Sequence, residues 1–237
     1  GDTEPCRVCG GQRNQDLEVL GTLDTQLQQL TEQMDSPSVR QELDAWCQSP
    51  RVQELGPSTR RRLLPLIART ADWLAQGRAS ELGVTRFVDW LDGVLRRESY
   101  LAQLLERPEV HLRLLRVLGT ARWPARYLMQ HPGVIDELDD PHLLDGRFDA
   151  ASFEQELCER RAALARGGED DEENLLDLLR RAQHAEVFRT LLRDVDGRLT
   201  VEQVADDLSA LADAILRVSL AWCWPLLRRR HRPQPLL

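Results

Sequence analysis

Signals that start α-helices recur along this chain at short intervals, and they restrict its fold more than any other feature. A Ser, Thr or Pro precedes or opens each segment of helical periodicity, at positions where helix caps and first-turn prolines are favoured. The segments between these signals lack the alternating, β-branched character of strands. We therefore predict an all-α protein with no β-sheet. The residues are Ser36, Pro37, Pro57, Ser58, Thr85, Pro108, Pro124, Pro132 and Ser152.

The spacing of these signals predicts an antiparallel helical array or bundle of about nine helices. The segment between residues 84 and 106 is expected to break near Ser99, and residues 124–138 are expected to form two short pieces. The predicted spans are 16–34, 37–48, 58–76, 84–106, 109–119, 124–138, 150–166, 170–194 and 201–229.

The last predicted helix carries the clearest pattern, since its apolar residues are spaced three and four apart and fall on one stripe. Its start resembles a capping box from Thr200 to Gln203. The preceding helix is expected to end near Gly197, so that a short turn makes the two helices an antiparallel pair. The stripe consists of Val201, Val204, Leu208, Leu211, Ile215, Val218 and Trp222, and the apolar face of the preceding helix consists of Leu175, Leu179, Ala182 and Ala185.

The composition restricts the classes of partner. The 237 residues, 42% of them hydrophobic, are enough for one extended domain or two small ones. A net charge of -8 disfavours binding to nucleic acid or anionic membranes, so we expect no nucleic acid and no membrane among the partners. The apolar stretches are far shorter than the roughly 20 residues of a membrane-spanning helix, and the sequence does not open with a charged-then-apolar signal segment, so we expect a cytoplasmic location. All 31 basic residues are Arg, which excludes Schiff-base chemistry and the lysine of a phosphate-binding loop.

The five cysteines are odd in number and scattered, which favours reduced thiols. Cys6 and Cys9 have the spacing of half a zinc knuckle, but no second Cys or His pair lies at a suitable distance along the chain. We favour a flexible N-terminus with two free thiols over a metal site.

The segment from Asp194 through Asp196 to Gly197 resembles the middle of a calcium-binding loop. In that register Leu192 and Gln203 occupy the first and twelfth ligand positions, so two carboxylates are missing. The Asp-x-Asp pair also resembles the metal-holding pair of a nucleotidyltransferase, but it lacks the strand and the Gly-rich loop that such a site needs. We therefore interpret the segment as the C-terminal turn of a helix.

Two charged runs have electrostatic explanations. The acidic run Glu169–Glu173 could bind a cation or a partner, but acidic residues at a helix N-terminus interact favourably with the helix dipole. The basic run Arg228–Arg232 could bind phosphate, but cations are equally expected at a helix C-terminus. We predict helix ends in both cases.

The histidines and tryptophans do not form a recognisable catalytic or binding centre. The five histidines are not paired at metal-ligand spacing, and the six tryptophans mostly fall on apolar helix faces, which suits core packing. We therefore predict no catalytic, cofactor-binding or metal-binding residue in this chain. The residues concerned are His111, His131, His142, His184, His231, Trp46, Trp73, Trp90, Trp123, Trp222 and Trp224.

Four segments match the pattern of one known family in order and spacing, namely Arg116–Leu138, Asp140–Leu144, Glu169–Glu173 and Leu178–Leu216. From about Tyr100 onward the chain thereby resembles the bifunctional glutamine synthetase adenylyltransferase/adenylyl-removing enzyme. The resemblance implies a central helical regulatory or linker region over residues 16–99 and, over 100–230, a helical bundle leading into a nucleotidyltransferase domain. Residues 1–15 are expected to form a flexible N-terminus, and residues 231–237 a linker.

The resemblance also implies a function. The parent enzyme transfers AMP from ATP to a tyrosine of glutamine synthetase and removes it by phosphorolysis, with Mg²⁺ as its metal and with glutamine and the PII signal protein as regulators. The family's Gly-x-Gly-Lys loop and Ser-Asp-x-Asp pair have no counterpart in this sequence and are expected after Leu237. We therefore expect a noncatalytic regulatory or connecting fragment. The alternative is a stand-alone helical protein-interaction scaffold.

Overall fold

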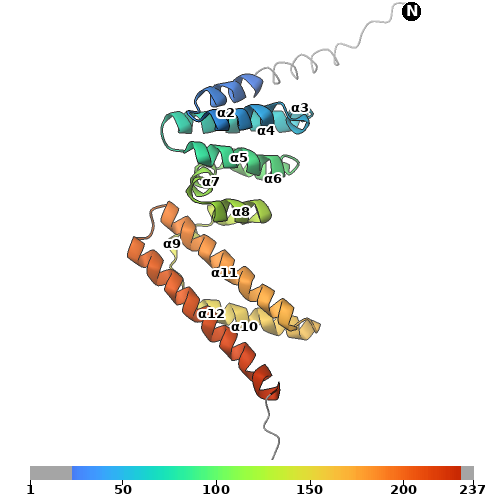
Figure 1. Cartoon of the computed structure of the whole chain (residues 1–237), viewed down its shortest axis with the longest axis vertical. Helices are drawn as coiled ribbons and strands as arrows, with labels where there is room; N and C mark the ends of the chain where they lie inside the picture. The colour runs from blue at the N-terminus through green and yellow to red at the C-terminus, as the bar shows by residue number, and fades with distance from the viewer. Residues whose placement is uncertain (1–22, 231–237) are drawn as a thin grey trace, which may run out of the picture. The chain divides into compact units, whose positions relative to one another are not determined.

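A computed structural model of the chain describes residues 23–230, with the exception of the side chains of Leu226, Arg229 and Arg230. Every regular element among these residues is a helix (Figure 1), which confirms the all-α prediction. The described residues form two compact units, divided between Asp139 and Asp140.

The first unit begins with helical residues 23–32 and continues through seven α-helices and one 3-10 helix. Most of these helices match the predicted spans. The short helix at residues 50–53 was not predicted, and the expected break near Ser99 lies between residues 94 and 98. The elements are α2 (Pro37–Cys47), α3 (Pro50–Gln53), α4 (Pro57–Ala75), α5 (Glu81–Val94), α6 (Glu98–Glu106), α7 (Pro108–Thr120), α8 (Arg122–Gln130) and η1 (Pro132–Asp139).

Small residues allow helices α5 and α7 to pack closely in the first unit. A Cβ atom added to Gly83 would lie 2.5 Å from the carbonyl oxygen of Leu115, and one added to Gly119 would lie 3.5 Å from the Cα atom of Gly83. Ser80 caps α5 by accepting a hydrogen bond from the Gly83 amide at 3.1 Å. This crossing places the buried rings of Phe87 and Trp90 in the core.

A buried histidine joins α4 and α7. The Nδ1 atom of His111 accepts a hydrogen bond from Arg69 at 3.1 Å, and its Nε2 atom lies 3.1 Å from the hydroxyl of Thr70. That hydroxyl donates to the carbonyl of Leu66, so it accepts from the imidazole, which is therefore neutral with its proton on Nε2. Burial, and then the charge of Arg69, hold the pKa of His111 well below its usual value of 6.5.

The second unit contains four helices: α9 (Pro141–Asp145), α10 (Ala150–Gly167), α11 (Glu172–Val195) and α12 (Val201–Arg230). Helices α11 and α12 lie side by side (Figure 1). The short helix α9 was not predicted, whereas the other three match their predicted spans. The core between α10, α11 and α12 consists of Phe153, Leu157, Leu175, Leu179, Leu211, Ala214, Val218 and Trp222.

The turn between α11 and α12 confirms the predicted sequence signals. Gly197 has a φ of 70°, which a glycine adopts without strain. The Thr200 amide donates to the side chain of Gln203 at 2.9 Å, and the Gln203 amide donates to the Thr200 hydroxyl at 3.3 Å. The two residues therefore form the expected reciprocal capping box. Asp196 is the C-cap of α11, so the Asp-x-Asp segment is the end of a helix.

Two ionic contacts hold the second unit together. The buried carboxylate of Asp207 on α12 accepts two hydrogen bonds from Nε and one from Nη2 of Arg147, which precedes α10. Within α11, the buried Arg193 pairs with the buried Glu186 at 3.1 Å and donates to the carbonyl of Leu143 in α9 at 2.7 Å. Arg147 thereby joins the segment before α10 to α12, and Arg193 joins α11 to α9.

Candidate interaction sites

The face that α12 buries differs from the predicted stripe at the N-terminal end of the helix. Val201 and Leu208 were expected in the core but are 80% and 38% exposed. The face that packs against α10 and α11 is formed by Asp207, Leu211, Ala214, Val218 and Trp222. Leu211, Val218 and Trp222 belong to the predicted stripe, so the prediction is confirmed for these three residues. The prediction was wrong at the N-terminal end of α12 because the helix has apolar residues on more than one face. There the bond from Arg147 to Asp207 determines which side turns inward.

Large apolar side chains remain exposed on the C-terminal half of α12. Leu216 is 60% exposed, Leu220 67%, Trp224 61% and Leu227 49%. Their spacing of three or four residues places them along one side of the helix, away from the side that carries buried Val218. We call these four residues the α12 apolar face. An exposed row of apolar side chains of this kind is typical of a surface that contacts other protein segments.

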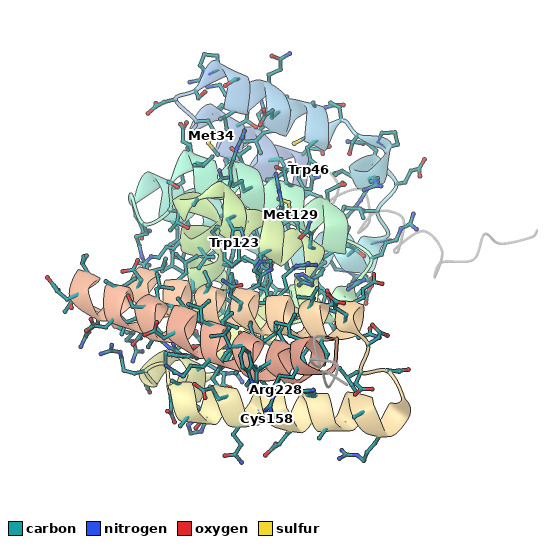
Figure 2. The ribbon with its side chains drawn as sticks, turned by 60° about the horizontal axis from the view of Figure 1, so that its bottom comes forward. Met34, Trp46, Trp123, Met129, Cys158 and Arg228 are labelled. Carbon is teal, nitrogen blue, oxygen red and sulfur yellow. The ribbon has the colours of Figure 1, made fainter. Side chains whose placement is uncertain are left out.

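A pocket of about 540 Å³ lies at the ends of α2 and α3 and beside α5, within the first unit. We call it the α2–α5 pocket. Arg51 spans it and pairs with Asp92 at 2.5 Å. The Trp46 side chain is labelled in Figure 2. The residues that line the pocket are Trp46, Ser49, Pro50, Arg51, Asp89 and Asp92.

Negative charge gathers around this pocket. Burial, followed by the carboxylates of Glu42 and Asp92, raises the pKa of Asp89. Nearby, burial and then Asp44 and Asp24 raise the pKa of Cys47 to about 11, so the Cys47 thiol stays protonated at neutral pH. The surroundings of the pocket therefore favour a cation over an anion.

The prediction that the tryptophans pack in the core is confirmed for Trp73, Trp90 and Trp222, which are buried. It is wrong for Trp123 and Trp224, which are 37% and 61% exposed. The apolar spacing on which the prediction relied marks an apolar face, but it does not show whether the unit supplies a partner for that face.

The acidic run lies at a helix start, as predicted. Asp171 is the N-cap of α11 and accepts a hydrogen bond from the Asn174 amide at 2.9 Å, and Glu172 and Glu173 follow in the first turn. Of the basic run, Arg228 lies near the C-terminal end of α12, and the side chains of the following arginines are not described.

Cys6, Cys9 and His231, together with residues 1–15 and 231–237, lie outside the described residues. Residues 23–230 contain no group of three or more His, Cys, Asp and Glu side chains placed to hold a metal ion. None of the described helices is long and apolar enough to cross a bilayer.

The described residues thus form two compact helical units, the first with the α2–α5 pocket and the second with the α12 apolar face. The profile of the glutamate-ammonia ligase adenylyltransferase family matches residues 111–236, which is more than half of the chain. The chain belongs to this family.

Curated relatives give the same result. The bifunctional glutamine synthetase adenylyltransferase/adenylyl-removing enzyme of Ralstonia nicotianae is 39% identical over 201 residues, covering 85% of this chain and 21% of the relative. The protein of the same name from Burkholderia mallei is 47% identical over 152 residues, covering 64% of this chain and 16% of the relative. That from Neisseria meningitidis serogroup B is 38% identical over 73% of this chain and 18% of the relative. The chain thus spans about a fifth of the length of these relatives.

Proposed function

We propose that this chain is the noncatalytic connecting and regulatory segment of a glutamine synthetase adenylyltransferase. The parent enzyme would be cytoplasmic, would transfer AMP from ATP to a tyrosine of glutamine synthetase, and would remove it by phosphorolysis. ATP and Mg²⁺ would bind to other parts of that enzyme. The observation that carries the proposal is the α12 apolar face, in a chain that spans only about a fifth of its relatives.

The α12 apolar face supports a connecting role because such residues gain free energy when they leave water. Leu216 and Leu220, each at least 60% exposed, have no cover within the described part of this chain. Most of each relative has no counterpart here, so its further residues are available to cover this face. A helix held by its own core on one side and by other protein on the opposite side can transmit a change of packing between them.

A bound regulator would shift the equilibrium between two arrangements of these helices. The PII signal protein and glutamine, which the resemblance implies as regulators, would each have to bind one arrangement more tightly than the other. The difference in binding would then change the position of the α12 apolar face against the catalytic part. Glutamine synthetase is the substrate partner in this proposal.

The first test is an activity measurement on the isolated chain. Incubated with glutamine synthetase, Mg²⁺ and labelled ATP, it is expected to transfer no label, whereas the full-length enzyme labels glutamine synthetase under the same conditions. Label transferred by the isolated chain would refute the noncatalytic assignment.

The second test examines the connecting role in the full-length enzyme. The double variant Leu216→Glu/Leu220→Glu places charges on the α12 apolar face, and we expect a weakened response of AMP transfer to PII and glutamine. Leu176→Glu on α11 is the matched control, since Leu176 is also exposed, at 53%, but lies outside this face. An unchanged response in the double variant, with both variants folded by circular dichroism, would contradict the proposal.

A further inference from the structure

The two units are connected by a very short segment between η1 and α9. η1 ends at Asp139 and α9 begins at Pro141, so Asp140 alone separates the two helices. The boundary between the units falls at the same place, between Asp139 and Asp140. Hinges between domains are usually a few residues at the ends of such elements. The freedom of this connection therefore depends on how firmly each helix is held in its own unit.

Contacts with α7 and α8 hold η1 in the first unit. The side chains of Ile135 and Leu138 in η1 are buried. Arg113 of α7 donates a hydrogen bond to the carbonyl of Leu138. Arg107, the N-cap residue of α7, pairs with the carboxylate of Asp139 at 3.0 Å. η1 is therefore fixed in the first unit up to its last residue.

Arginine contacts hold α9 in the second unit. Arg193 of α11 donates to the carbonyl of Leu143 at 2.7 Å, and Arg198, in the turn after α11, pairs with Asp145. The segment that follows α9 is also held, because Arg147 donates three hydrogen bonds of 2.6 to 2.9 Å to the buried carboxylate on α12. The chain is therefore fixed in the second unit from α9 onward.

Asp140 is itself bound to α9. Its carboxylate accepts a hydrogen bond from the His142 amide at 2.8 Å, and its carbonyl accepts one from the Leu144 amide at 3.2 Å. Pro141 disfavours the helical conformation for the residue before it, and Asp140 has a φ of -85° and a ψ of 108°. The peptide bond between Asp139 and Asp140 is planar. Rotation about ψ of Asp139 and φ of Asp140 is therefore the movement that breaks none of these contacts.

The contacts on both sides locate a hinge. We propose that the Asp139–Asp140 peptide is the joint at which the two units change their relative orientation, with η1 moving as part of the first unit and α9 as part of the second. A joint of two torsions lets the units rotate without altering either core. The inference concerns the described chain itself and does not rest on the proposed function, so either can fail without the other.

The test measures residual dipolar couplings of the amides in the ¹⁵N-labelled chain, aligned in a stretched polyacrylamide gel. We expect the couplings of residues 133–138 to fit the alignment tensor of α4, α5 and α7, and those of residues 142–149 to fit the tensor of α10, α11 and α12. The two tensors should differ in amplitude, because movement at the joint averages the couplings of one unit relative to the other. A single tensor for both units would overturn the proposal. Couplings of residues 142–149 that fit neither tensor would also overturn it, since the flexible segment would then be longer than the joint.

Asp140→Pro tests the joint directly. Proline fixes φ near about -65°, close to the φ of -85° at this position, and it disfavours the helical conformation of Asp139. We expect the difference in amplitude between the two tensors to shrink. Asp140→Ala is the matched control, since it loses the same capping carboxylate but keeps both torsions free, and its tensors should differ as in the wild type. Equal effects of the two substitutions would contradict the proposal, and the amide signals of α5 and α12 report whether each variant is folded.

Discussion

At the scale of single residues, the buried His111 makes the stability of the first unit depend on pH. The hydrogen bond that its Nδ1 atom accepts from Arg69 requires the neutral imidazole, and the pKa of His111 in the folded chain lies well below 6.5. Below about pH 6.5 the unfolded chain binds a proton at this residue and the folded chain does not. The stabilisation is therefore complete above that pH and is lost as the pH falls.

We predict that the unfolding free energy of the first unit falls between pH 6.5 and 5 with a contribution from His111 of up to about 1.4 kcal/mol per pH unit. Urea titrations followed by amide signals of α4 and α7 measure this slope. His111→Gln should remove the contribution, whereas His131→Gln should retain it because His131 is exposed. Equal slopes in the wild type and His111→Gln would show that the imidazole is not held neutral.

A second prediction concerns the buried ion pair in α11. Arg193→Met leaves the carboxylate of Glu186 buried with only Arg189 nearby, at 3.3 Å, and should destabilise the second unit by about 3 kcal/mol. Adding Glu186→Gln removes the buried carboxylate charge and should recover much of that loss. The control is Arg180→Met, whose side chain is 64% exposed, and it should change stability by less than about 1 kcal/mol. Urea unfolding monitored in α11 distinguishes these outcomes, and equal losses in the single and double variants would contradict the argument.

At the scale of elements, the close crossing of α5 and α7 depends on Gly83. A methyl group at this position would meet the backbone carbonyl of Leu115, which cannot rotate away, so Gly83→Ala should destabilise the first unit by about 2 kcal/mol. Gly93 lies in the same helix with nothing within 4 Å of an added Cβ, so Gly93→Ala should stabilise it by about 0.5 kcal/mol. Thermal unfolding of the two variants, compared with the wild type, should give shifts of opposite sign. A loss of similar size in both would show that helix propensity, and not the crossing, determines the result.

The helices of both units show which features the sequence could predict. The turn at Gly197 and the capping box of Thr200 and Gln203 could be predicted, because each depends only on residues that are close in sequence. Local sequence was insufficient for the buried face of α12, since the inward side is determined by Arg147, about 60 residues earlier in the chain. The α2–α5 pocket was not predicted for the same reason: Trp46 and Asp89 lie in different helices, and no local signal joins them. The charged residues alone gave no indication of a cavity.

At the scale of the whole chain, we predict that the two units fold independently. The second unit has a core of its own, formed by residues between Phe153 and Trp222. Arg161 of α10 covers one edge of this core, since its guanidinium lies 5.1 Å from the centre of the Trp222 ring. The first unit has a separate core around Phe87, Trp90 and His111. A unit with its own hydrophobic core and internal hydrogen bonds meets the physical requirements for a domain.

The measurement compares residues 23–139 and residues 140–230, produced as separate fragments, with the intact chain. We expect the dispersed amide signals of each fragment to coincide with those of the same residues in the intact chain, apart from residues near the cut. A further cut between α11 and α12 is the control, because it divides the core shared by Leu179 and Leu211 and should leave both pieces unfolded. If either 23–139 or 140–230 gave the collapsed spectrum of an unfolded chain, its core would depend on the other unit, and regulation would have to act on one cooperative body instead of two.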